Sequence, residues 1–457
     1  MSVPRSHIPE HCKGEPLRRR PPVPVFVMLL GGLCVLSSLR LVVGLLTWPL
    51  FWLGVWRWGW PPHLVRLPTA WRHFRRTLTI APPFPGLPPL SRLWLLLRIW
   101  GAVLRIPISG LAWFADELLF RGTLDATPVD APLLMLSAAR SGSTQMGHYL
   151  EEDPELCAPV MLQVLFPYLW LWHLVVPTLG RLVSSEWLSA RFDATIPVEM
   201  KQRHEGHPLR TDTFDVLFWV HGTHLVSSMA GPSAMAEAIP FMGTAPANRR
   251  MWDVDFVRFM DRLGRKTVHF AGPKADGRPR RLFVKGHFLE ARDALAHQWP
   301  EAHFLTVVRD PTKRLESMIN FLHANAIEEP LGAPPWNWIT PFLEEAEARY
   351  CEVEQEWFSR DDATHRTIIR FEDYVGELEG TMRVVYQRCM DRDTLPPHLP
   401  KEHPPRQRKD YLVHRTLDDL QVDVSAYEAR LAGFRSWLAE MDGLPDSRTS
   451  GLPDSLQ

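Results

Sequence analysis

Basic, hydroxyl and imidazole side chains gather in three short segments, each directly after an apolar run of the chain. The first segment reads Arg140-Ser141-Gly142-Ser143-Thr144 and follows residues 132–136. The second holds Lys285 and His287, and the third holds Arg309 with Ser317 eight positions later. Backbone N–H groups at a helix start and guanidinium groups bind phosphate. A histidine can take a proton from a hydroxyl group near neutral pH. The three segments therefore predict a phosphate-handling site with an acid–base group.

The elements around these segments indicate an α/β fold. Residues 132–136, 281–287 and 303–308 are short apolar runs typical of buried strands, and each is followed by a stretch with helical periodicity. Alternating strands and helices favour a parallel sheet flanked by helices, which binds ligands at the carboxyl ends of its strands. The loop at 137–144 is P-loop-like, but it lacks the Gly-Lys-Ser/Thr ending of a Walker A motif.

Taken together, the order and spacing of the three segments resemble those of the sulfotransferases that use 3'-phosphoadenosine 5'-phosphosulfate (PAPS), over residues 131–390. The resemblance implies that the loop binds the 5'-phosphosulfate through Arg140, Ser141, Gly142, Ser143 and Thr144. It implies that Arg309 and Ser317 bind the 3'-phosphate, and that residues 406–409 close over the nucleotide. His287 would be the general base and Lys285 would neutralise the leaving group, with no metal required.

Acceptor identity is suggested by residues 160–183, which follow the phosphate loop and are short of charge. We expect the acceptor pocket near this segment, and its apolar character favours a hydroxyl acceptor that is a lipid or another amphipathic alcohol. Plain core packing of the same residues is the alternative. A P-loop-type kinase and a catalytically inactive membrane adaptor with the same fold are the competing functions. The missing Walker A lysine disfavours the kinase, and the intact Lys285, His287, Arg309 and Ser317 disfavour the adaptor.

Composition and charge divide the chain into two parts. The whole chain of 457 residues has a formal charge of -1, which excludes an overall basic nucleic-acid binder. Residues 1–115, however, carry 14 basic and 2 acidic side chains, and no acidic residue occurs between Glu15 and Asp116. The five cysteines show no C-x-x-C spacing, which argues against a disulfide scaffold and a thiolate zinc site.

An apolar N-terminal region predicts attachment to a membrane. Residues 23–39 and 41–56 are uncharged and are separated only by Arg40. Each run is short for a membrane span of about 20 residues, and an arginine inside a span is costly. We therefore expect a hairpin that turns near residues 37–40, with one long tilted span as the alternative. Arginines on both flanks place both ends of a hairpin in the cytoplasm, where PAPS is made, whereas a single span would place the enzyme in a compartment such as the Golgi lumen.

The sequence thus predicts five regions. They are a basic tail at 1–22, a membrane hairpin or anchor at 23–60, a basic linker with an interfacial helix at 61–130, a sulfotransferase domain at 131–442 and a disordered tail at 443–457. Within the linker, we expect Pro107 to end the apolar helix that begins near residue 91.

Overall fold

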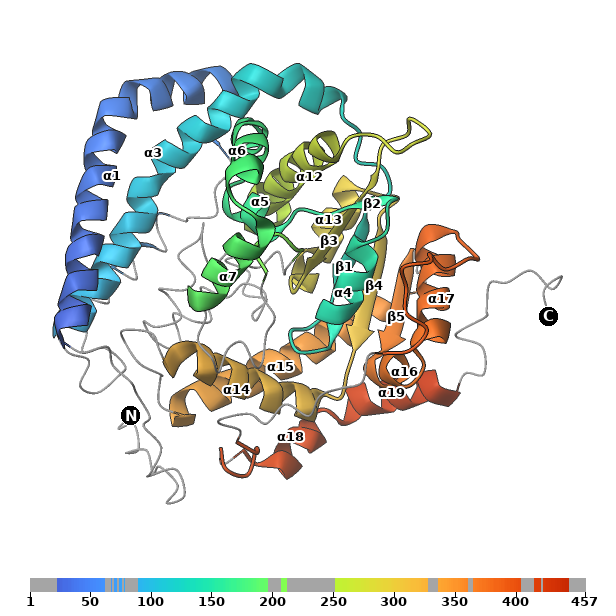
Figure 1. Ribbon diagram of the computed structural model, residues 1–457. Helices are drawn as coiled ribbons and strands as arrows, with labels where there is room; N and C mark the ends of the chain where they lie inside the picture. Colours follow the sequence, from blue (N-terminus) through green and yellow to red (C-terminus); the bar gives the residue numbers. More distant parts are fainter. Residues whose placement is uncertain are drawn as a thin grey trace.

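The computed structural model describes residues 23–61, 89–195, 207–211, 251–327, 336–360, 365–403, 415–420 and 422–443, and a few positions between 62 and 88 (Figure 1). The basic N-terminal tail, the tail after residue 443 and the basic segment 406–409 lie outside the described residues.

A parallel sheet of five strands forms the centre of the molecule. The strands are β1 Leu133–Leu136, β2 Leu156–Cys157, β3 Arg281–Gly286, β4 His303–Val308 and β5 Arg366–Arg370. Their order is β2-β3-β1-β4-β5, so the chain moves to one side after β1 and to the other side with β4 and β5. In such a sheet the direction of winding switches between β1 and β4, which is where open α/β sheets bind ligands. The predicted parallel sheet flanked by helices is confirmed.

Helices cover both faces of this sheet. In the α/β domain they are α4 Ser143–Glu151, α5 Met161–Leu165, α6 Leu169–Leu182, α7 Ser185–Thr195, a π-helical turn at Met251–Phe256, α12 Val257–Ala271, a 3₁₀ turn at Leu289–Ala291, α13 Arg292–Gln298, α14 Pro311–Ile327, α15 Trp336–Phe358, α16 Phe371–Gly376, α17 Leu378–Met390, α18 Val424–Arg430 and α19 Ala432–Gly443.

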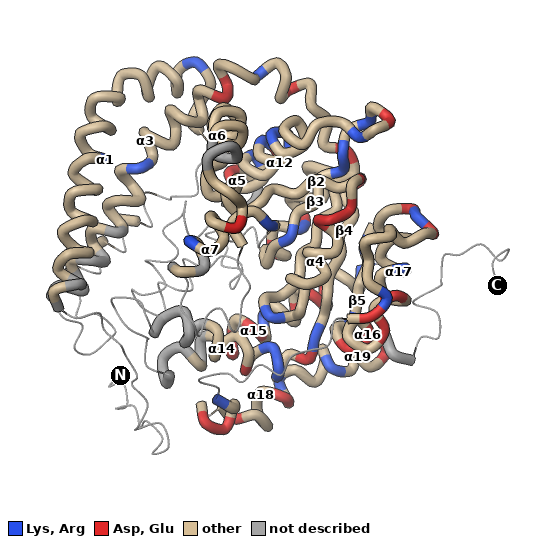
Figure 2. Tube along the Cα trace, in the orientation of Figure 1, with Lys and Arg blue, Asp and Glu red and all other residues tan. Residues whose placement is uncertain are grey.

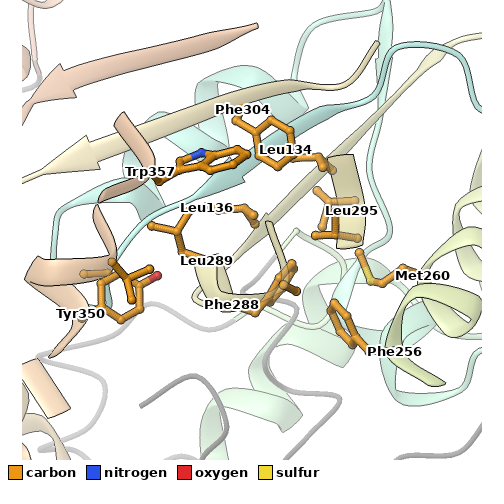
Figure 3. Close-up of a cluster of buried hydrophobic side chains, with 14 of the residues drawn as sticks. Leu134, Leu136, Phe256, Met260, Phe288, Leu289, Leu295, Phe304, Tyr350 and Trp357 are labelled. Atoms are coloured by element: carbon orange, nitrogen blue, oxygen red, sulfur yellow. The ribbon is translucent and has the colours of Figure 1, made fainter. Parts of the chain in front are cut away.

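Successive residues of β1 contribute side chains to two separate hydrophobic clusters, one on each face of the sheet. Leu134 and Leu136 of β1 point into a large cluster with α12, α13 and α15, part of which is shown in Figure 3. Leu133 and Met135 point into a second cluster with α4, α16 and α17. This alternation follows from the two-residue period of a strand. Because both faces are covered, β1 is apolar throughout, and the packed strands hold the loops at their carboxyl ends in fixed positions.

The N-terminal region consists of two long helices, α1 Val23–Trp58 and α3 Pro89–Ala126. Within α1, residues 27–58 form the one described helix that is long and apolar enough to cross a membrane, with a mean hydropathy of 2.1. The turn that the sequence predicts near residues 37–40 is absent, because α1 is continuous through them. Arg40 lies instead against α3, where a Cβ on Gly101 would be 3.1 Å from its guanidinium nitrogen. The predicted break at Pro107 is also wrong, since α3 continues through it.

The second half of α3 is anchored in the α/β domain by a buried ion pair. Lys266 of α12 and Asp116 of α3 are fully buried and lie 2.7 Å apart. Asp116 also accepts hydrogen bonds from the backbone N–H groups of Leu169 and Trp170, at the start of α6. The Lys266 ammonium group lies 3.4 Å from the centre of the Trp113 ring. These contacts fix α3, and therefore α1, relative to the sheet.

Candidate active site

The loop between β1 and α4 has a backbone that only a few residues can adopt. Gly142 precedes α4 with φ at 89°, and Arg140 has φ at 68°. A Cβ on Gly142 would lie 2.3 Å from the Phe371 ring, so no other residue fits there without displacing α16. The loop therefore turns sharply and delivers the first N–H groups of α4 to the carboxyl end of β1. Free N–H groups at a helix start attract anions.

Hydroxyl groups of the loop face into this turn. Ser141 and Ser143 are buried, and Thr144 is half-buried. Within the part of the chain that the structure describes, the Ser141 hydroxyl is buried and makes no hydrogen bond. Buried polar atoms usually have a partner, so an oxygen of a bound anion would satisfy this one.

Arg140, Arg309 and Ser317 meet at the switch point of the sheet. The Nε atom of Arg140 donates to the Ser317 hydroxyl over 2.9 Å, across 177 positions of sequence. Arg309, directly after β4, donates to the Arg140 carbonyl oxygen over 2.9 Å. Aromatic rings hold both guanidinium groups: Phe321 lies under Arg140 and Phe371 lies under Arg309. The first and third sequence segments therefore form one positively charged site.

Lys285 and His287 lie beside the loop, at the end of β3. Lys285 is buried, and its aliphatic chain crosses α4 at Gly147, where a Cβ would lie 2.8 Å from it. The Nδ1 atom of His287 is 2.8 Å from the carbonyl oxygen of Ser137. A carbonyl oxygen only accepts hydrogen bonds, so Nδ1 carries the proton in the neutral ring and Nε2 carries the lone pair. His287 is therefore oriented as a proton acceptor.

A small pocket opens next to His287, between the loop and helices α14 and α15. Its volume is about 20 Å³, which is room for about one water molecule, and it opens to solvent. Most of its lining is apolar; one polar side chain reaches it from the residue after β3 and two reach it from α15. The lining residues are Ala138, Ala139, His287, Met318, Leu343, Ala346, Glu347 and Tyr350.

Behind the pocket lies a buried network centred on Arg314. Its guanidinium group pairs with Glu347 and, at 2.8 Å, with Glu354. Burial raises the pKa of both carboxyl groups, and the nearby Arg314 opposes this. The backbone N–H of Ala138 also lies near Glu354 and opposes the rise in the pKa of its carboxyl group. The network therefore lies between the loop after β1 and the wall of the pocket.

Sequence reasoning missed this network. Residues 160–183, near which we expect the acceptor pocket, contain α5 and α6 and do not line the pocket beside His287, so that location stays a prediction. Glu347, Cys351 and Glu354 share one face of α15 at helical spacing, which is a visible signal for a buried polar stripe. Nothing in the sequence, however, says that this face meets Arg314.

The sequence profile that describes the sulfotransferase family matches residues 132–391, which are more than half of the chain. This chain belongs to the sulfotransferase family. Its fold is similar to that of sulfotransferase STF9 from Mycobacterium avium, with a TM-score of 0.55 and 16% identity over 84% of this chain and 95% of that one. It is also similar to sulfotransferase STF1 from Mycobacterium tuberculosis H37Rv, with a TM-score of 0.53 and 17% identity over 80% and 92% of the two chains. No curated protein matches the chain.

Proposed function

We propose that this sulfotransferase moves a sulfuryl group from PAPS to a hydroxyl group of a membrane-derived acceptor. The observation that carries the proposal is the meeting of Arg140, Arg309 and Ser317 at the switch point of the sheet. A donor with phosphate groups at both the 5' and the 3' position needs cationic and hydroxyl partners for each phosphate. The loop at 140–144 would supply one set, and Arg309 with Ser317 would supply the other. Arg309 and Ser317 would bind the 3'-phosphate, and Arg140 with residues 141–144 would bind the 5'-phosphosulfate.

In the proposed reaction, Nε2 of His287 takes the proton of the acceptor hydroxyl as its oxygen attacks sulfur. The bond between sulfur and the bridging oxygen breaks, and 3',5'-ADP leaves with the electron pair. Lys285 and the N–H groups at the start of α4 would stabilise the negative charge that develops on the leaving phosphate. The Ser137 carbonyl would keep the proton on Nδ1 of His287, so that the lone pair stays on Nε2.

The pocket supports an acceptor that is a lipid or another amphipathic alcohol. Its apolar lining would contact the carbon atoms next to the acceptor hydroxyl, and His287 would receive that hydroxyl group, while the rest of the acceptor would lie outside the pocket. We further propose that the enzyme works on the cytoplasmic side of a membrane, since its donor is made there.

The experiment is a transfer assay with the full chain in membranes, PAPS labelled with ³⁵S, and an extract of total lipids. We expect the label to appear in an organic-soluble product, and the His287→Ala variant to form little of it. Label that enters only water-soluble acceptors would contradict the lipid proposal. No transfer to any acceptor, by a chain that binds 3',5'-ADP, would contradict the proposed reaction.

A further inference from the structure

The outer surface of α1 is apolar along nearly its whole length. One stripe of the helix is covered by α3 and contains Leu30, Ser37, Gly44 and Phe51 at seven-residue spacing. The rest of its described circumference is open: Met28, Leu46 and Trp56 are 68%, 75% and 80% exposed. Figure 2 shows α1 on the outside of the molecule with few charged positions. Such a surface needs a hydrocarbon environment, because water around it is unfavourable.

The direction of α3 relative to α1 limits how α1 can be placed in a membrane. Positions along the two helices meet in ascending order. Gly101 faces Arg40, Gly110 faces the Phe51 ring, and Phe114 faces Gly54. The helices are therefore parallel, as Figure 1 also shows, and the chain must return between them. If α1 crossed the bilayer, residues 59–88 would have to cross it back. That segment holds four arginines, several prolines and no acidic residue, a composition unsuited to hydrocarbon.

Arginines of α3 give an independent second argument. Arg92, Arg98 and Arg105 lie on the half of α3 that runs beside the first part of α1. With a rise of 1.5 Å per residue they extend over about 20 Å. In a spanning arrangement they would lie at successive depths of the hydrocarbon. Burial raises the pKa of Tyr168 in the α/β domain to about 12, and the charge of the nearby Arg105 opposes this rise, so Arg105 lies beside that domain.

We propose that α1 lies in one leaflet, roughly parallel to the plane of the membrane, and that α3 lies between it and the α/β domain. In this orientation positions 92, 98 and 105 of α3 lie at similar depths rather than at successive ones. The tryptophans at 48, 52, 56 and 60 lie at or near the end of α1, where aromatic rings favour the interface. The positive charge of residues 1–115 selects a leaflet with anionic lipids. This mode of attachment does not depend on the proposed reaction.

The test measures depth along a single stripe of α1. Met28, Val35 and Leu46 are exposed and share one face of the helix, over about 27 Å of its length. Each is changed to cysteine in a full chain with Cys12→Ser and Cys34→Ser, labelled with a fluorophore and reconstituted into anionic vesicles. Lipids with nitroxide groups at defined depths then quench the label. Arg383→Cys on α17, on the opposite side of the molecule in Figure 1, is the control and should not be quenched.

We expect the same quenching depth at all three positions, and we expect 0.5 M salt to leave the chain on the vesicles. A depth that passes through the bilayer centre from Met28 to Leu46 would overturn the proposal in favour of a span. Release by salt alone, or no quenching at any position, would overturn it by showing that α1 is not buried in lipid.

Discussion

At the scale of single residues, the site depends on groups whose orientation is set by backbone atoms. Ser137 illustrates this: its carbonyl oxygen orients His287, and its hydroxyl group accepts a hydrogen bond from the N–H of Val307 in β4. One residue at the end of β1 thus ties together β1, β4 and the candidate base.

The first prediction concerns that base. His287→Ala should lower turnover by about 10²–10⁴-fold, the usual range for a positioned general base. Binding of 3',5'-ADP should stay near that of the unchanged enzyme, because the proposed nucleotide contacts do not include His287. His297→Ala, an exposed histidine on α13, is the control and should leave turnover unchanged. If His287→Ala retains full turnover, another base acts, and His148 on α4 is the next candidate.

Site residues could be predicted from the sequence where they lie at the carboxyl ends of strands. Arg140, Lys285, His287 and Arg309 follow apolar runs, and parallel strands bring such positions to one edge of the sheet. Glu347 and Tyr350 belong to a helix whose rotation and partner are set by tertiary packing. No local pattern fixes that packing, so the pocket that these two residues line could not be placed.

At the scale of elements, the phosphate loop is shaped by the close approach of α16. Phe371 packs directly over Gly142 and lies 4.4 Å from the Arg309 guanidinium group. The same ring therefore selects the glycine of one segment and positions the arginine of another.

Gly142→Ala should consequently destabilise the chain and weaken nucleotide binding. The left-handed backbone costs about 1–3 kcal/mol for a non-glycine residue, and the added Cβ collides with Phe371. Gly376→Ala on α16 meets no atom within 4 Å and is the matched control. Urea unfolding and titration with 3',5'-ADP measure both effects. Equal free energies of unfolding and equal 3',5'-ADP affinities in the two variants would show that the loop accommodates an alanine at position 142.

Helices were the elements for which sequence reasoning failed in part. Arg40 and Pro107 both argue for an interruption when each helix is considered alone. In the structure, Gly101 leaves room for Arg40, and Pro107 packs 3.5 Å from the position of a Cβ on Gly44. The partner helix thus compensates locally for residues that would otherwise end an isolated one.

At the scale of the whole molecule, a few buried ionisable groups govern stability. Lys266→Met should lower the free energy of unfolding by about 3–5 kcal/mol, because it leaves Asp116 buried without its partner. Arg278→Ala, which breaks an exposed pair with Asp276, should leave the free energy of unfolding nearly unchanged. Similar losses in the two variants would mean that the buried pair does not anchor α3.

A second prediction at this scale concerns acid. Burial lowers the pKa of His303 to about 3, whereas an unfolded histidine titrates near 6.5. Below pH 6.5 the unfolded chain therefore binds a proton at His303 that the folded chain does not bind. The free energy of unfolding decreases as the pH is lowered from 6.5 to about 3. One such group contributes a loss of about 2 kcal/mol between pH 6.5 and 5. His303→Gln should show a correspondingly smaller decline in urea unfolding. Identical pH dependence in both proteins would contradict a buried neutral His303.

The most direct test of the central claim is calorimetric titration of the full chain in detergent with 3',5'-ADP and with 5'-AMP. A charge-assisted contact to the 3'-phosphate is worth about 1.5–3 kcal/mol, so 3',5'-ADP should bind about 10-fold to 150-fold more tightly. Arg309→Ala should remove most of this difference, and the control Arg278→Ala should keep it. Equal affinity for the two nucleotides in the unchanged protein would contradict a PAPS site built from Arg140, Arg309 and Ser317.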